Sequence, residues 1–252
     1  MTAPGARFEG RVALVTGAAS GLGRATAWLL AAEGASVVGV DVDAAGLLET
    51  GKECQGGRFE PVVRDLASAA ACRAAVEDAV ARGPGLDVLC NVAGINRFHH
   101  FLEMPEDEWQ KILAVNLSSV AFLCQAALPH LIARRGCIVN VASIAATKGQ
   151  AYTVAYCASK GGVVQLTRAL AMEFIDAPVR INAVAPGGIE TAMNRNLVFP
   201  EGMDWSKVKP YTGRRGMARA EEIAAVIAFL ASDDASNVHG AVWAVDGGMA
   251  AG

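Results

Sequence analysis

Tyr156 and Lys160 are the two side chains whose types and spacing are best suited to proton transfer. They lie four residues apart, so a helix would place the phenol and the ammonium on one face. A tyrosine with a pKa near 10 is a poor proton shuttle, and lowering that pKa to about 7 requires about 4 kcal/mol in favour of the phenolate. One lysine charge at about 4 Å, with an effective dielectric constant near 20, supplies about that much, but desolvation of the phenolate opposes the shift, so a further positive charge would have to help. Taken alone, the same spacing also fits an ordinary pair on an exposed helix.

Ser143 precedes Tyr156 by thirteen residues and follows a run typical of a β-strand, Cys-Ile-Val-Asn-Val-Ala. A residue at the carboxyl end of a strand lies where open α/β sheets bind their ligands. The Ser143 hydroxyl would then hold a substrate oxygen while Tyr156 transfers the proton.

A glycine-rich turn follows the first predicted strand and reads Thr-Gly-Ala-Ala-Ser-Gly-Leu-Gly over residues 16–23. A tight turn without side chains lets the backbone approach a pyrophosphate, and the amides at the start of the next helix face that group. A plain strand-to-helix connection is the alternative reading of the glycines. The position at the first βα junction favours cofactor binding, by Gly17, Ser20, Gly21, Leu22 and Gly23.

Asp41 closes the second predicted strand, 18 positions after Gly23. A carboxylate there accepts both ribose hydroxyls of NAD and repels the 2′-phosphate of NADP. No basic residue replaces Ser20 or directly follows Asp41, so the sequence favours NAD and makes NADP the less favoured cofactor. Asp43 competes for this role, but its position suits a helix N-cap.

Short β-branched runs alternate with longer Ala- and Leu-rich segments along the whole chain. The runs predict strands at 12–16, 36–41, 60–63, 86–91, 137–143, 180–185 and 241–245, and the segments predict helices at 23–33, 69–82, 106–132, 154–174 and 220–232. Repeated βα units with right-handed crossovers indicate an α/β, Rossmann-like, doubly wound fold, a seven-stranded parallel sheet with helices on both faces. With 252 residues and no linker, we expect residues 1–252 to form one dinucleotide-binding domain.

Composition excludes several classes of function. The chain is 53% hydrophobic and 19% charged, with a net charge of −3 and no basic stripe, so we expect no nucleic-acid partner. The sequence shows neither a signal core nor an uninterrupted apolar run of about 20 residues, so we expect no membrane partner and a cytoplasmic location. The cysteines lack the spacing of a zinc site or a disulfide frame, and no metal is expected: Cys54, Cys72, Cys90, Cys124, Cys137 and Cys157.

Taken as an ordered set from Arg11 to Gly248, these motifs resemble the short-chain dehydrogenases/reductases in their compact form of about 250 residues. The matching motifs are Thr16-Gly17-x3-Gly21-x-Gly23, Asp65-Leu66, Asn91-x-Ala93-Gly94, Asn116, Ser143, Tyr156-x3-Lys160, Pro186-Gly187-x3-Thr191 and Asp246-Gly247-Gly248. Val92 departs from the family pattern, which has a second asparagine there, and this puts local strand hydrogen bonding in question.

The resemblance implies a role for each matching residue. Asn116, Ser143, Tyr156 and Lys160 would form the catalytic tetrad, with Lys160 also holding the nicotinamide ribose and Asn116 stabilising a proton-relaying water. Asp65 would contact the adenine amino group beside Leu66. The remaining predicted cofactor contacts are Asn91, Ala93 and Gly94 at the adenosine ribose, and Pro186, Gly187, Ile189 and Thr191 near the nicotinamide carboxamide.

The implied reaction interconverts a secondary alcohol and a ketone by hydride transfer, with a small-molecule substrate as partner. Residues 95–101, 144–152 and an apolar lid over 188–211 would wall the substrate, which favours a hydrophobic steroid-like, alicyclic or acyl molecule. The predicted lid contains Met193, Leu197, Val198, Phe199, Met203 and Trp205.

Two alternatives stay open. The first is a 3-oxoacyl thioester reductase acting on acyl carrier protein, which would be NADP-dependent and therefore fits Asp41 poorly. The second is a non-catalytic NAD-sensing regulator, which the complete tetrad argues against. The family resemblance also implies a homotetramer, a dimer of dimers, paired through the apolar helices 106–132 and 154–174.

Overall fold

The computed structural model describes residues 6–54, 59–191, 197–211, 213 and 215–251. Seven parallel strands form one sheet, as predicted, and their order is β3-β2-β1-β4-β5-β6-β7. Their bounds are β1 Val12–Thr16, β2 Ser36–Asp41, β3 Phe59–Val63, β4 Val88–Asn91, β5 Cys137–Val141, β6 Arg180–Pro186 and β7 Val242–Val245. Strands β1, β4 and β5 are buried along their whole length. Their sequences are therefore apolar runs without alternation, as expected for a parallel sheet covered on both faces.

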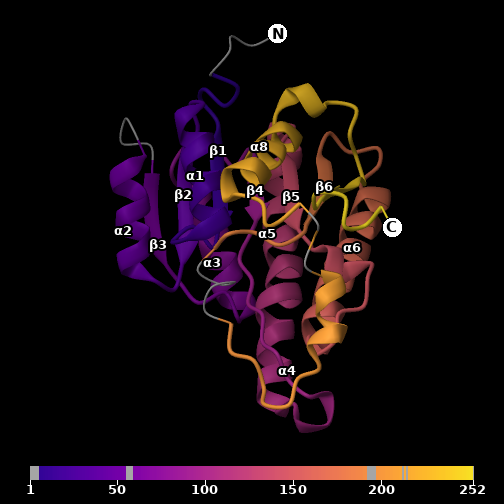
Figure 1. Cartoon of the computed structure of the whole chain (residues 1–252). Helices are drawn as coiled ribbons and strands as arrows, with labels where there is room; N and C mark the ends of the chain where they lie inside the picture. Colours follow the sequence, from indigo (N-terminus) through magenta and orange to yellow (C-terminus); the bar gives the residue numbers. More distant parts are fainter. Residues whose placement is uncertain (1–5, 55–58, 192–196, 212, 214, 252) are drawn as a thin grey trace.

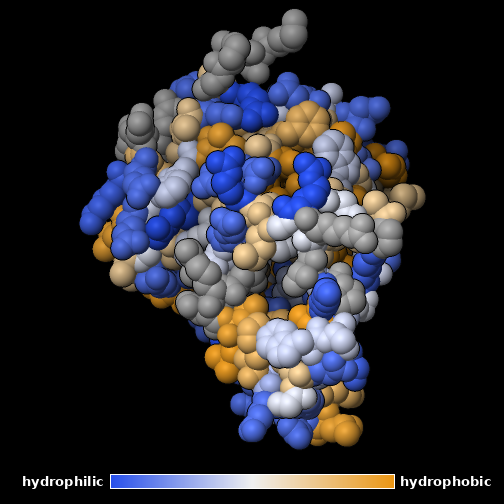
Figure 2. Space-filling view, viewed as in Figure 1, coloured by the Kyte–Doolittle hydropathy of each residue, from blue (hydrophilic) through white to orange (hydrophobic). Residues whose placement is uncertain are grey.

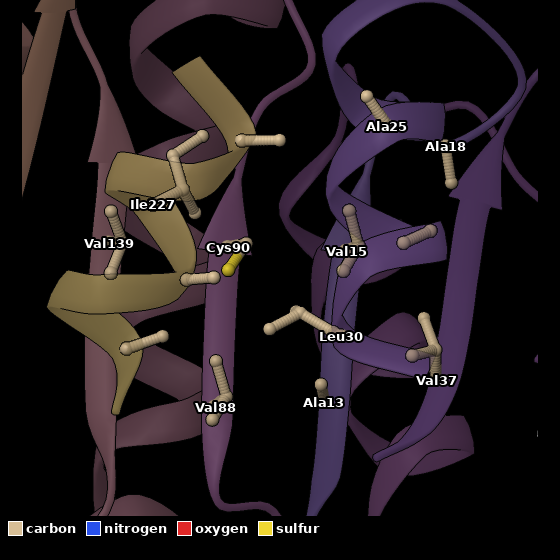
Figure 3. Packing of buried hydrophobic residues seen from close by; sticks show 14 of the residues in the cluster. Ala13, Val15, Ala18, Ala25, Leu30, Val37, Val88, Cys90, Val139 and Ile227 are labelled. Carbon is tan, nitrogen blue, oxygen red and sulfur yellow. The ribbon is translucent and has the colours of Figure 1, made fainter. Parts of the chain in front are cut away.

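Helices cover both faces of the sheet, as Figure 1 shows. Helices α1 Gly21–Ala32, α2 Ala44–Glu53 and α8 Ala220–Ala231 lie on one face, and α3 Ala69–Val80, α5 Ser119–Arg134 and α6 Val154–Glu173 lie on the other. Leu30 of α1 and Ile227 of α8 meet Val15, Cys90 and Val139 from three neighbouring strands (Figure 3). Both faces of the sheet are therefore packed as hydrophobic cores, which holds the strand ends rigidly.

The main departures from the predicted elements are local. Helix α2 was not predicted, because Gly46 and Gly51 weaken its helical pattern. Its start was identified: Asp43 caps it, accepting a hydrogen bond from the Gly46 amide at 3.1 Å. Strand β5 ends at Val141 rather than at Ser143, and Ser143 caps the short 3-10 turn that follows.

The long helix predicted over 106–132 is interrupted. Helix α4 Glu106–Leu113 and α5 are joined by a π-helical segment, Ala114–Ser118, which contains Asn116. The combined helix Glu106–Arg134 has a mean hydropathy of 1.7 over its most apolar window, so by length and composition alone it could cross a membrane. Leu123, Ala127 and Leu131 are buried against the sheet and α3, as in the core helix of a globular fold.

The strand order reverses between β1 and β4, since β2 and β3 lie on one side of β1 and β4 to β7 lie on the other. At such a switch point the loops after the two central strands diverge and leave a crevice at the carboxyl edge. The fold therefore provides a ligand site where the glycine turn was predicted.

Candidate functional site

A cavity of about 960 Å³ opens along the carboxyl ends of strands β1 to β6. Seventeen of the predicted site residues line it: Gly17, Ser20, Gly21, Leu22, Gly23, Asp41, Asp65, Leu66, Ala93, Gly94, Ser143, Tyr156, Lys160, Pro186, Gly187, Ile189 and Thr191. The other two, Asn91 and Asn116, are buried beside the cavity and are not among its lining residues. The parallel sheet thus brings distant motifs to one edge.

The glycines of the first turn are required by close backbone contacts. A Cβ atom on Gly23 would lie 2.0 Å from the Gly17 carbonyl oxygen. Gly17 has φ +71°, and a Cβ there would lie 3.0 Å from the Cα atom of Ala93. The turn is therefore packed tightly against the loop after β4, and at its glycines it presents backbone rather than side chains to the cavity.

The N-terminus of α1 differs from those of the next two helices. Side chains cap α2 and α3, through Asp43 and Ser68, whereas Ser20 makes no capping hydrogen bond to α1. The first amides of α1 therefore face the cavity with their partial positive charge uncompensated by a cap. This is the arrangement that binds a phosphate group.

Asp41 lies at the end of β2 with both carboxylate oxygens oriented by backbone amides. Oδ2 accepts a hydrogen bond from the Ala19 amide and Oδ1 accepts one from the Asp43 amide, each at 3.1 Å. Each oxygen keeps a further lone pair for a ligand hydroxyl. The carboxylate is thus held beside the glycine turn, in the place expected for recognition of a ribose.

Lys160 is buried on α6 with its ammonium inside the protein. Its Nζ atom donates to the Val141 carbonyl at 2.7 Å, and no carboxylate contacts it among the described residues. Burial lowers the pKa of Lys160 to about 8. A Cβ on Gly94 would lie 3.4 Å from Nζ and equally far from Oδ1 of Asn116, so these three residues meet at one point.

Asn116 holds the loop after β4 in place. Its Oδ1 accepts from the Ile95 amide at 2.8 Å, and its Nδ2 donates to the Ile95 carbonyl at 2.9 Å and to the Ser159 hydroxyl at 3.1 Å. The π-helical segment places the residue deep enough to reach this loop, and such bulges are common at functional sites. Asn116 therefore couples the cavity wall to the helix that carries Tyr156 and Lys160.

The phenol of Tyr156 is buried beside Ser143 and Lys160. Burial raises the pKa of its phenol, and a hydrogen bond with the Ser143 hydroxyl acts in the opposite direction. The Nζ atom of Lys160 lies 5.8 Å from the centre of the tyrosine ring and donates to Val141 instead. Desolvation is therefore the largest influence on the phenol and opposes its ionisation, as expected from the sequence.

The loop after β4 explains how the chain accommodates Val92. Asn91 turns its side chain into the core, where its Nδ2 donates to Asn140 Oδ1 at 2.8 Å, and Asn140 in turn donates to Thr167. The hydroxyl oxygen of Thr16 accepts hydrogen bonds from the amides of Val92 and Ala93, both at 3.0 Å. Strands β1, β4 and β5 are thus connected without a second asparagine side chain.

The predicted lid is described over residues 197–211, whereas Met193 lies outside the described residues. The lid is joined to the loop before α6 by two tyrosines: Tyr152 Oη accepts from the Asp204 amide at 2.9 Å, and Tyr211 Oη accepts from the Ala151 amide at 2.8 Å. Tyr152 has φ +67°, a strained conformation that its neighbours hold in place. Val198 and Phe199 of the lid are exposed. Figure 2 shows apolar surface at the lower end of the molecule, where α4 lies in Figure 1.

Sequence reasoning missed several cavity residues. Arg64 and Lys111 line the cavity but belong to no motif. Gln150 and Tyr211 lie in segments that were predicted only as walls or lid. The position of Arg64, directly before Asp65 at the end of β3, is the one signal that could have identified a further cofactor contact.

A nicotinamide dinucleotide fits the residues present. The glycine turn and uncapped helix suit its pyrophosphate, and Asp41 suits a ribose. Ser143, Tyr156 and Lys160 line the same cavity. Gly17, Gly23 and Asp41 would hold it at the adenosine end, with Lys160 at the nicotinamide end.

Comparison with known proteins agrees with this geometry. A family model described as enoyl-(acyl carrier protein) reductase matches residues 17–250. The chain is 40% identical to a 3-oxoacyl-acyl-carrier-protein reductase of Thermotoga maritima, covering 96% of this chain and 99% of that protein. It is 42% identical to a cis-4-hydroxycyclohexanecarboxylate dehydrogenase of Sinomonas cyclohexanicum, covering 98% and 99%.

A solved structure of a Brucella melitensis 3-ketoacyl-(acyl-carrier-protein) reductase, complexed with NADH, has a TM-score of 0.85 at 32% identity. The alignment covers 96% of this chain and 99% of that one. The chain belongs to the short-chain dehydrogenase/reductase family.

Proposed function

We propose that this protein is an NAD-dependent oxidoreductase that interconverts a secondary alcohol and a ketone of a hydrophobic molecule. The observation that carries the proposal is that Ser143, Tyr156 and Lys160 line one cavity with the glycine turn and Asp41. In that cavity a cofactor bound at the turn would present its reactive end to the tetrad.

When bound, the nicotinamide ring supplies or accepts the hydride. Tyr156 takes the proton of the substrate hydroxyl in oxidation and returns it in reduction, while Ser143 donates a hydrogen bond to the substrate oxygen. The charge of Lys160 stabilises the phenolate, but burial opposes that form. In the oxidation direction, the positive charge of the oxidised nicotinamide ring would therefore have to contribute to the activation.

NAD is the proposed cofactor because a negative charge, that of Asp41, lies where the adenosine ribose would bind. Asp41 would accept the ribose hydroxyls and repel a 2′-phosphate. Arg64 lines the same region, but its guanidinium is paired with Asp78 at 2.6 Å, which offsets its charge. The NADH named for the Brucella relative agrees with this preference.

The decisive test is Tyr156→Phe. Removing the hydroxyl leaves the ring in place, so we expect turnover to fall by at least 10³-fold, while NADH affinity, measured by fluorescence, stays within about threefold. Tyr211→Phe is a control for loss of a phenolic hydroxyl in the same cavity and should keep measurable turnover. An active Tyr156→Phe enzyme would refute the assignment.

A second candidate is reduction of 3-oxoacyl thioesters, which the similarity to the Thermotoga reductase favours. That activity in this chain would require turnover of a 3-oxoacyl thioester. Steady-state rates with such a thioester and with alicyclic ketones, each measured with NADH and NADPH, separate the two candidates.

We propose further that the chain forms one domain, is cytoplasmic and assembles as a homotetramer. An apolar groove runs between α5 and α6, with Phe122 and Leu128 on one side and Leu166 and Leu170 on the other. A second copy packed on this groove would cover it. Phe122→Asp should reduce the mass measured by light scattering, and an unchanged mass would contradict pairing through this face.

A further inference from the structure

Gln150 is a polar side chain of the cavity wall that the proposed mechanism does not use. It lies in the loop between Ser143 and Tyr156 and lines the cavity. Its side-chain amide makes no hydrogen bond to any described residue, and its polar atoms are not among those sealed from solvent. An accessible amide at this place is available to a ligand.

Tyr211 brings a second donor to the same wall from the lid. Its hydroxyl oxygen accepts the hydrogen bond from the Ala151 amide, the neighbour of Gln150 in sequence. The hydroxyl hydrogen has no acceptor among the described residues, and Tyr211 also lines the cavity. Gln150 and Tyr211 thus offer two neutral donors from adjacent segments. The hydrogen bond from the Ala151 amide fixes the position of the Tyr211 hydroxyl.

Three aromatic side chains also line the cavity. The rings of Phe98 and Phe199 lie 4.9 Å apart at 68°, and those of Phe199 and Trp205 lie 4.9 Å apart at 67°. All three residues line the cavity, together with Ile144 and Val208. Edge-to-face packing of this kind makes a rigid wall that suits a compact ring.

We infer that the substrate is a compact cyclic ketone or alcohol that carries a second, hydrogen-bond-accepting oxygen group, held by Gln150 and Tyr211. The reacting oxygen would face Ser143 and Tyr156 while the second oxygen receives the two donors and the ring contacts the aromatic wall. This inference rests on the proposed function. A molecule without the second oxygen leaves both donors desolvated and unpaired. We therefore expect its rate to be lower by about tenfold or more.

Three 4-substituted cyclohexanones test the inference: 4-methylcyclohexanone, 1,4-cyclohexanedione and 4-oxocyclohexanecarboxylate. Their reduction by NADH should show kcat/KM at least tenfold higher for one or both oxygen-bearing ketones than for the methyl compound. Gln150→Leu should reduce that ratio about tenfold, mainly through KM. Because the variant removes a donor that the methyl compound leaves unpaired, it should not slow reduction of that compound, and NADH binding, measured by fluorescence, should stay within twofold. Gln110→Leu, on the exposed surface of α4, is the matched control.

Each outcome of this experiment is decisive. A higher rate for the dione indicates a neutral second group, and a higher rate for the carboxylate indicates an anionic one. Equal rates for all three ketones, an unchanged ratio in Gln150→Leu, or turnover of open-chain ketones alone would overturn the inference and leave the proposed oxidoreductase intact. Binding of NADH without turnover of any ketone or alcohol would instead overturn the proposed function itself.

Discussion

Replacing Lys160 by methionine should make the protein more stable at pH 7 while removing its activity. Burial lowers the pKa of Lys160 from 10.5 to about 8. Each pKa unit corresponds to about 1.4 kcal/mol, so keeping this lysine charged in the folded chain costs about 3 kcal/mol. Methionine fills a similar volume without that cost but loses the hydrogen bond to the Val141 carbonyl, worth about 1 kcal/mol. The expected net gain is about 2 kcal/mol.

The pH dependence of the free energy of unfolding shows whether the buried charge of Lys160 causes this difference. Between pH 8 and pH 10.5 the unfolded chain binds more protons at this position than the folded chain, so the wild-type free energy of unfolding rises with pH across this window. Below pH 8 the folded chain bears the full cost of burying the Lys160 charge, and above pH 10.5 this cost is absent. The advantage of Lys160→Met should therefore be largest at pH 7 and nearly gone at pH 9.5.

Urea unfolding of both proteins at pH 7 and pH 9.5 measures this difference, at one fixed protomer concentration because assembly contributes to stability. Lys52→Met, on the exposed surface of α2, is the matched control and should change stability by less than about 0.5 kcal/mol at either pH. A Lys160→Met protein less stable than wild type at pH 7, or a difference independent of pH, would refute the reasoning.

Three further variants test other parts of the structure. Gly23→Ala places a methyl group 2.0 Å from the Gly17 carbonyl and should weaken NADH binding at least tenfold in fluorescence titrations, whereas Gly149→Ala, with no atom within 4 Å, should not. Asp41→Ala should lower the ratio of kcat/KM for NAD over NADP at least tenfold, and an unchanged ratio would exclude a ribose contact. Arg134→Met removes the guanidinium that lies 3.0 Å from the buried carboxylate of Asp87, and should lower the free energy of unfolding by about 2 kcal/mol. Exposed Arg73→Met is the control, and equal urea midpoints for Arg134→Met and wild type would contradict the pairing.

The fold was predictable from sequence because its signals are local and repeated. Each strand is a short β-branched run, each βα unit has one favoured handedness, and both faces of the sheet require apolar residues. Helix α2 was not predicted because its glycines weaken the helical pattern of its sequence. The π-helical segment at Asn116 has no sequence pattern that distinguishes it from an α-helix. Helix α6 was predicted correctly to within one residue, whereas α5 forms only the second half of the helix predicted over 106–132.

The sequence by itself determined the residue types of the site, since a tyrosine and a lysine four residues apart, a glycine turn and a terminal aspartate can be read as motifs. Only the tertiary structure decided their energetics. Desolvation depends on everything packed around a group, so burial raises the pKa of Tyr156 and lowers that of Lys160. The positions of Gln150 and Tyr211 also depend on the tertiary structure, because neither belongs to a motif and the lid places the Tyr211 hydroxyl against Ala151, the neighbour of Gln150.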